Sequence, residues 1–167
     1  VIRAVNEAPL SDSVVAAAVI QMLVPVWLGL LVIPLYLFGR DLYGERPARY
    51  AVLLWPLLPS VALWATRWNQ LYALFTLLAF LSLAWGLKRH RLWPVALSGG
   101  IVALATFFSL GNLVIAGFLG LFALVWVWDQ AARPSPGWLV AAGSMFAAGI
   151  LFFWGFLRLA YGLNPVA

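Results

Sequence analysis

The sequence contains no cysteine and one histidine, and only 9% of its 167 residues are charged. The absence of cysteine excludes disulfide bridges, iron–sulfur clusters and thiolate zinc sites. A single histidine, His90, argues against a histidine-built metal site and against a Ser–His catalytic pair. The chain is instead rich in apolar side chains, since 65% of its residues are hydrophobic and its mean hydropathy is +1.01.

This shortage of charge excludes two broad classes of protein. Soluble domains carry about 25% charged residues, so this chain has too few charged groups to cover a globule exposed to water. Disordered chains combine low hydrophobicity with high net charge, which is also not the case here. The composition therefore predicts an integral membrane protein. We assign the net charge of +5 to basic cytoplasmic loops and expect no nucleic-acid partner.

Six apolar runs approach the roughly 20 residues that a membrane-spanning helix requires. They predict an all-α fold, a polytopic transmembrane helix bundle of about six spans that forms a single domain over residues 1–167. The second and fifth spans are short, and Pro56 and Pro59 are expected to kink the second. The predicted spans lie near residues 13–38, 50–66, 71–87, 92–110, 113–128 and 138–157. Since the chain begins at a valine and ends beside an apolar run, we expect it to be part of a longer protein.

The ten basic residues divide unequally between the two sides that six spans define. Seven fall on one side and three on the other. Because cytoplasmic loops are enriched in lysine and arginine, we predict that the side with seven is cytoplasmic. Both chain ends are then on the outer side, in a plasma or inner membrane. The seven are Arg40, Arg46, Arg49, Lys88, Arg89, Arg91 and Arg133, and the three are Arg3, Arg67 and Arg158.

The predicted cytoplasmic loop at residues 39–49 is the most patterned segment. Gly39 and Gly44 can end or turn a helix, and Pro47 suits the first turn of the next one. No strand precedes the glycines, as a phosphate-binding loop requires, so we interpret the segment as a tight basic connector. Local ion pairs are expected here, between Arg40 and Asp41 or between Glu45 and Arg46.

The predicted outer turn at residues 65–72 is the strongest candidate site. Arg67 is a permanent cation on the side that is poor in positive charge, and Asn69 and Gln70 add amide donors and acceptors. An arginine beside such groups can hold a phosphate or a sugar hydroxyl. The alternative, which the sequence leaves open, is an interfacial arginine that extends toward lipid headgroups.

Other polar residues have simpler structural interpretations. The turn at residues 109–112 has ordinary turn residues, and His90 is expected to contact lipid headgroups. Glu7 and Asp12 are the only acidic residues predicted on the outer side. Either could be a catalytic group or a metal ligand; the alternative is that Glu7 is simply solvated and Asp12 caps a helix. No charged residue lies at the centre of a predicted span, which argues against an ion-coupled transporter.

Three stretches each join a helix to a distinctive loop or turn. They are residues 35–54, with Gly-Arg-Asp-Leu-Tyr-Gly; residues 57–75, with Leu-Leu-Pro-Ser and Arg-Trp-Asn-Gln-Leu-Tyr; and residues 100–112, which end in Phe-Phe-Ser-Leu-Gly-Asn. In this order they resemble the membrane core of GT-C glycosyltransferases, of the dolichyl-phosphate-mannose–protein mannosyltransferase and aminoarabinose transferase type. The resemblance covers roughly residues 13–128 and describes an internal fragment or a divergent member.

The resemblance implies a transferase that uses a polyprenyl-phosphate sugar as its donor at the outer face, among membrane lipids. It implies that Arg67 contacts the phosphate and that Asn69, Gln70 and Asn112 contact the sugar or phosphate. The family often has an acidic residue where this chain has Asn69 and Gln70, and a lysine near Asn112. Its catalytic aspartate lies in an outer loop before the first predicted span, so the catalytic residue stays unassigned here. A divalent metal is expected only if that loop supplies carboxylates.

A non-catalytic membrane subunit is the competing interpretation. Its aromatic-rich helices would pack against partner proteins, lipids or pigments. The few acidic residues predicted outside favour this interpretation, and the polar turn at residues 67–70 disfavours it. A transporter is a third alternative.

Overall fold

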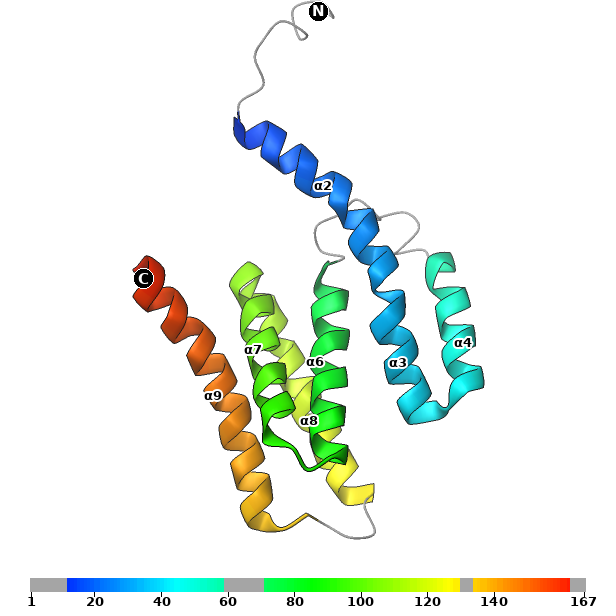
Figure 1. The fold of residues 1–167 in the computed structure, drawn as a ribbon, viewed down its shortest axis with the longest axis vertical. Helices are drawn as coiled ribbons and strands as arrows, with labels where there is room; N and C mark the ends of the chain where they lie inside the picture. Colours follow the sequence, from blue (N-terminus) through cyan, green and yellow to red (C-terminus); the bar gives the residue numbers. More distant parts are fainter. Residues whose placement is uncertain (1–11, 59–70, 130–133, 163–167) are drawn as a thin grey trace, which may run out of the picture.

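The computed structural model describes residues 12–58, 71–129 and 134–162, and these form helices and their connections without any strand (Figure 1). The predicted all-α bundle is thereby confirmed for this part of the chain. Its elements are α2 (Asp12–Leu30), α3 (Val32–Tyr43), α4 (Glu45–Leu54), the short 3-10 helix η1 (Trp55–Leu57), α6 (Leu71–Lys88), α7 (Leu92–Phe108), the 3-10 helix η3 (Leu110–Asn112), α8 (Leu113–Asp129) and α9 (Pro136–Tyr161).

Helices α2 and α3 follow one another with only Leu31 between them, and Figure 1 shows them as one long rod. The amide of Leu35 donates to the carbonyl of Leu31, so helical hydrogen bonding continues across the junction. The 30 residues from Val14 to Tyr43 extend about 45 Å at 1.5 Å per residue. This length exceeds the roughly 30 Å of a hydrocarbon core.

The expectation that a loop begins at Gly39 is wrong, because α3 continues to Tyr43. Gly39 has another role: a Cβ there would lie 3.3 Å from the Cα and Cβ of Ala48, which is almost fully buried. The missing side chain thus lets α3 and α4 approach closely. The turn between them is made by Gly44, whose φ of 91° is accessible mainly to glycine. Pro47 lies in the first turn of α4, as expected.

Helix α4 ends at Leu54, where η1 takes over. Pro56 explains this end, because proline has no N–H to donate within an α-helix and its ring clashes with the preceding turn. The second predicted span, at residues 50–66, therefore does not run as one α-helix through Pro56. Residues 59–66 of that span, with Pro59, lie outside the described part of the chain.

The expected ion pairs between neighbouring residues are also wrong. Arg49 pairs with Glu45, one helical turn away, and Lys88 reaches Asp41 at 2.8 Å. Adjacent side chains on a helix point in different directions, whereas side chains four residues apart share a face. Because residues 40–43 and 45–49 are helical rather than looped, the sequence neighbours Arg40–Asp41 and Glu45–Arg46 do not face each other.

Helices α6 to α9 form the second part of the bundle (Figure 1). A hydrophobic core lies between them, and the hydroxyl of the buried Ser98 on α7 donates to the carbonyl of Ala79 on α6 at 2.8 Å. The aromatic rings of Phe38, Phe80 and Phe122 connect α3, α6 and α8, with centroids 5.6 to 6.3 Å apart. The core cluster consists of Ala79, Leu83, Leu87, Val95, Val102, Leu119 and Ala142.

The closest helix crossing joins α7 to α9 through two glycines. A Cβ on Gly99 would overlap the carbonyl group of Phe146, and a Cβ on Gly149 would overlap that of Ala96. Small residues at a crossing let two backbones approach, and this is how helices associate where lipid removes the usual hydrophobic driving force. The reciprocal approach of glycine Cα to carbonyl oxygen is the geometry of weak Cα–H···O contacts.

Four helical segments in the described ranges are long and apolar enough to cross a membrane. They are Val14–Tyr43, Leu71–Lys88, Leu110–Asp129 and Pro136–Tyr161. Large apolar side chains point away from the core, among them Trp128 at 83% and Leu159 at 90% exposure. Soluble proteins rarely leave extensive apolar patches open to water, whereas lipid tails would cover them. These features indicate a membrane protein.

Candidate functional site

The two ends of the bundle carry different chemistry. In Figure 1, the α3–α4 turn, the α6–α7 turn and the end of α8 lie at the lower end. The start of α2, the α7–α8 turn and the end of α9 lie toward the upper end. We call these the charged end and the uncharged end after their turns, because the charged side chains of the described turns gather at the first; Arg158, in the last turn of α9, lies at the second. Of the predicted site residues, Asn112 lies at the uncharged end, and Arg67, Asn69 and Gln70 lie outside the described residues.

The turn that holds Asn112 is fixed by hydrogen bonds to the end of α7. The backbone leaves the helix at Ser109, which is extended and whose amide donates to the carbonyl of Ala105 at 3.2 Å. The amide of Asn112 donates to the carbonyl of Ser109 at 3.0 Å, and its side-chain Nδ2 donates to the carbonyl of Ala105 at 2.8 Å. Asn112 thus caps α7 and is half-buried.

The side-chain oxygen of Asn112, unlike its side-chain nitrogen, is not used in capping α7. No hydrogen bond from any other described residue reaches Oδ1, so this oxygen remains an acceptor. An amide whose nitrogen is held by a helix end presents its oxygen in a defined position. Such an acceptor can receive a hydrogen bond from a sugar hydroxyl.

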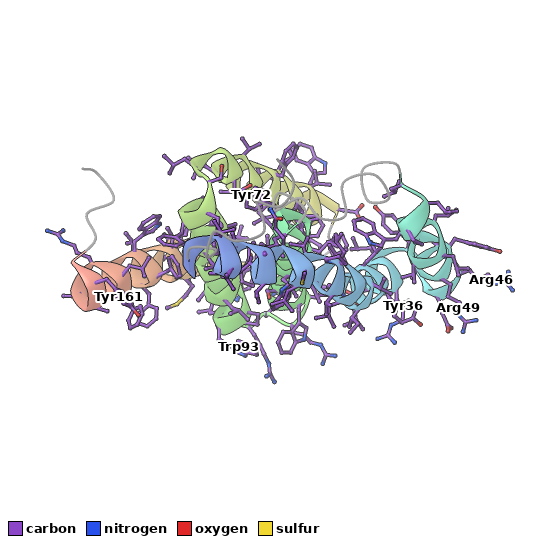
Figure 2. The ribbon with its side chains drawn as sticks, turned by 90° about the horizontal axis from the view of Figure 1, so that it is seen from above. Tyr36, Arg46, Arg49, Tyr72, Trp93 and Tyr161 are labelled. Atoms are coloured by element: carbon purple, nitrogen blue, oxygen red, sulfur yellow. The ribbon has the colours of Figure 1, made fainter. Side chains whose placement is uncertain are left out.

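The first turns of α6 pack beside this turn. The rings of Phe75 and Phe108 are stacked, with centroids 5.9 Å apart and planes 7° from parallel. The hydroxyl of Thr76 donates to the carbonyl of Tyr72 at 2.7 Å, and Figure 2 labels Tyr72 in a view from above. The structure therefore places Asn112 at the same end as Leu71, the residue that follows Gln70 in the sequence.

The carboxylates whose side chains the structure describes lie at the other end of the bundle from Asn112. Asp41 pairs with Lys88 and Glu45 with Arg49, while Asp129 ends α8, and all three are at the charged end. No group of three or more potential metal-ligating residues occurs in the described ranges. Among the residues whose side chains the structure describes, no carboxylate lies at the uncharged end. Glu7 lies outside the described residues, and Asp12 begins α2.

The charged end is organised by ion pairs and aromatic rings. The hydrogen bond from Arg49 to Glu45, together with the charge of that carboxylate, raises the pKa of the exposed Arg49 guanidinium above its ordinary value. His90 has a φ of 49° and lies edge-on to two indoles, with its ring centroid 5.0 Å from that of Trp138 and 6.4 Å from that of Trp126. The sequence did not predict these ring contacts, since the residues come from three segments far apart in the chain.

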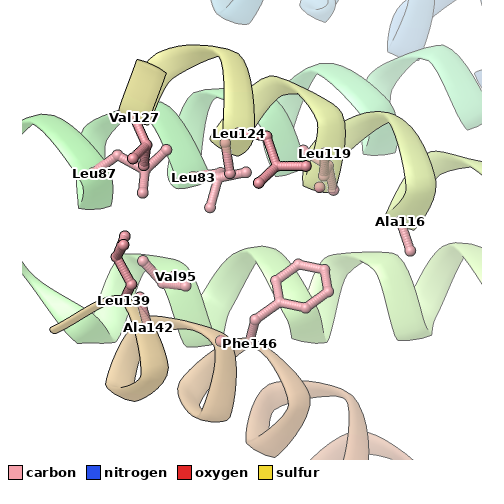
Figure 3. A pocket seen from close by; sticks show the side chains of 13 residues that line it. Leu83, Leu87, Val95, Ala116, Leu119, Leu124, Val127, Leu139, Ala142 and Phe146 are labelled. Carbon is pink, nitrogen blue, oxygen red and sulfur yellow. The ribbon is translucent and has the colours of Figure 1, made fainter. Parts of the chain in front are cut away.

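An open apolar cavity of about 410 Å³ lies between α8 and α9. Figure 3 shows its lining side chains from α6 and α8 on one side and from α7 and α9 on the other. The lining residues are Leu83, Leu87, Val95, Ala116, Leu119, Gly120, Ala123, Leu124, Val127, Leu139, Ala142, Gly143 and Phe146. The cavity depends on how these helices cross, which the sequence does not reveal. The one feature of the lining that the sequence could have suggested is a glycine on each of α8 and α9.

Comparison with known proteins identifies no relative. The chain matches no protein-family model, no curated protein and no solved structure. The chemistry of the chain's own residues therefore carries the functional argument.

Proposed function

We propose that the chain is the membrane core of a GT-C-type glycosyltransferase, which transfers a sugar from a polyprenyl-phosphate donor at the outer face of the membrane. The observation that carries this proposal is the position of Asn112, held by the end of α7 beside the first turns of α6. Its amide oxygen, which accepts no hydrogen bond from another described residue, lies at the same end of the bundle as Leu71, the residue that follows Asn69 and Gln70 in the sequence. The resemblance of residues 35–54, 57–75 and 100–112 to that family supports the same assignment.

The proposal includes a topology with six crossings and both ends of the chain on the outer side of a plasma or inner membrane. The alternating directions of the helices in Figure 1 support it. The charged turns would then be cytoplasmic, in keeping with the excess of lysine and arginine in cytoplasmic loops. Helix α7 would be one of the six, since it is apolar and its 17 residues are one fewer than those of α6.

In this proposal, Arg67 binds the donor phosphate and stabilises the charge that develops as the phosphate leaves. Guanidinium groups suit this role because they are permanently charged and bind phosphate oxygens in pairs. Asn69, Gln70 and Asn112 contact the sugar or the phosphate. The lipid-exposed helices lie among membrane lipids and the polyprenyl tail. A carboxylate from an outer loop acts as the general base on the acceptor hydroxyl, with a divalent metal only if that loop supplies its ligands.

The test is sugar transfer by the complete protein after Arg67→Ala, using a radiolabelled polyprenyl-phosphate sugar. Loss of a preorganised donor to a developing anion reduces turnover by about 10²- to 10³-fold, and this is the expected loss. Arg158→Ala is the matched control, because it removes an arginine from the same proposed side, at the end of α9. Unchanged transfer by the Arg67 variant at equal membrane abundance would contradict the assignment.

A non-catalytic membrane subunit is the second candidate function. One observation favours it: the carboxylates whose side chains the structure describes are all at the charged end. The same assay separates the two candidates. A complete protein that inserts normally, shows no transfer with any polyprenyl-phosphate sugar and co-purifies with a stable membrane partner would be a subunit.

A further inference from the structure

The cavity between α8 and α9 is partly open, and its lining extends to residues beside the charged end. Leu87 and Val95, which line it, lie next to the turn that joins α6 to α7, and Leu139 lies in the first turns of α9. Its volume of about 410 Å³ is within the range of about 300–1,000 Å³ of small-molecule sites. All its lining residues are apolar, so an occupant would be a hydrocarbon chain or a similarly apolar group.

The turn beside the cavity carries three cationic side chains in four residues. Lys88 is engaged by Asp41, to which it donates two hydrogen bonds of 2.8 Å, one to the side chain and one to the backbone carbonyl. Arg89 and Arg91 are exposed and form no ion pair within the described ranges. Asp129, at the end of α8, is the carboxylate of the neighbouring helix. Two exposed guanidinium groups of the turn between the lining residues Leu87 and Val95 are thus available to an anion.

Within the described residues, the indole N–H of Trp138 beside this turn is buried and has no hydrogen-bond acceptor. Trp138 packs against the core residues that line the cavity, and His90 of the cationic turn lies against its ring. Buried donors are nearly always satisfied, so an oxygen-bearing ligand at this point would supply the missing acceptor.

We propose that this cavity binds an anionic phospholipid of the adjacent leaflet. One acyl chain occupies the cavity between α8 and α9, and the phosphate lies at Arg89 and Arg91. A glycerol or ester oxygen accepts the hydrogen bond of Trp138. Basic pockets between membrane helices on the cytoplasmic side bind the headgroups of acidic lipids in this manner. The site is separate from the proposed transfer site at the uncharged end, and it stands whether or not the chain is a transferase.

The test measures lipid retention by the purified intact protein with native mass spectrometry. The probes are phosphatidylglycerol, phosphatidylcholine with identical acyl chains, and inorganic phosphate. We expect retention of one phosphatidylglycerol, no competition by inorganic phosphate and weaker binding of phosphatidylcholine. Each basic residue near an anionic lipid contributes about 1 kcal/mol, which is about fivefold in affinity. The double variant Arg89→Gln/Arg91→Gln is therefore expected to weaken phosphatidylglycerol binding by about 30-fold.

Matched variants separate this site from general attraction of the charged end to acidic lipid. Arg40→Gln/Arg46→Gln removes the same charge from exposed residues of α3 and α4, and it is expected to leave binding unchanged. Gly120→Leu fills the cavity, because its Cβ has no neighbour within 4 Å, and it is expected to abolish retention. Gly117→Leu, equally open but outside the lining, is expected to retain the lipid.

Each of the following results would overturn the proposal. They are equal retention of the two lipids, full binding by the Gly120 variant, and equal loss in the two arginine pairs. The Gly117 variant tests whether a leucine in α8 disturbs folding or membrane insertion of the protein. Loss of binding in both glycine variants therefore also counts against a specific cavity site.

Discussion

The two ends of the bundle differ in how they hold their turns. At the charged end, Lys88 joins the α6–α7 turn to Asp41 near the α3–α4 turn, so electrostatic attraction connects segments 47 residues apart. At the uncharged end, neutral hydrogen bonds from Ser109 and Asn112 close α7 locally. The first arrangement depends on salt and the second does not. The comparison shows that charges connect distant segments at one end, whereas neutral hydrogen bonds close a single turn at the other.

The largest expected loss of stability comes from a substitution at the crossing of α7 and α9, the two helices that run between the ends. Gly149→Ala places a methyl group against the carbonyl of Ala96, so α7 and α9 must separate. Overpacking of this kind costs about 3 kcal/mol. Thermal unfolding in detergent measures the loss. Gly155→Ala on the same helix is the control, because its Cβ has no neighbour within 4 Å, and it is expected to be neutral or stabilising by about 0.5 kcal/mol. Equal stability of the two variants would mean that α7 and α9 do not cross at these glycines.

A smaller effect is expected at the uncharged end. Asn112→Ala removes the hydrogen bond to Ala105 and is expected to cost about 1 kcal/mol. Since neutral hydrogen bonds are little affected by ions, this cost is expected to be the same at low and high salt. Ser109→Ala is the control, because the Ser109 hydroxyl makes no hydrogen bond with the described residues. A loss for Asn112→Ala that disappears in high salt would contradict the contrast between the two ends.

The smallest effect is expected at the charged end. Lys88→Ala breaks the ion pair with Asp41, whose two side chains are 33% and 44% exposed. Exposed pairs contribute only about 0.5 kcal/mol, and salt should reduce this further. A double-mutant cycle with Asp41→Ala measures the coupling at low and high salt. Coupling above about 2 kcal/mol, or coupling that salt does not change, would show that this end is more buried than the structure indicates.

Much of the fold could be predicted from where apolar runs begin. Helices α6, α7 and α8 begin at Leu71, Leu92 and Leu113, the same residues at which the predicted spans begin. The prediction failed at Gly39, because a glycine weakens a helix in isolation but permits a close helix contact once Ala48 lies against it. The ion pairs failed with it, since a helix and a loop bring different side chains together.

Less of the candidate sites could be predicted. The turn at Asn112 was recognised by its residue types, but its hydrogen bond to Ala105 depends on the extended backbone of Ser109. The cavity and the contact of His90 with Trp138 depend on the crossing of α7, α8 and α9, and sequence periodicity does not determine crossing angles. Arg67, Asn69 and Gln70 stay predictions, because they lie outside the described residues.

In the topology that we propose, the two ends face opposite sides of a membrane, with the uncharged end outside. Because these 167 residues contain no cysteine, a single cysteine introduced at either end is the one labelling position within them. Leu110→Cys, at a position that is 78% exposed in the α7–α8 turn, and Arg89→Cys in the α6–α7 turn are the two reporters. A membrane-impermeant maleimide added to intact cells is expected to label the first and to label the second only after permeabilisation. Labelling of Arg89→Cys alone in intact cells, or equal labelling of both, would contradict the account.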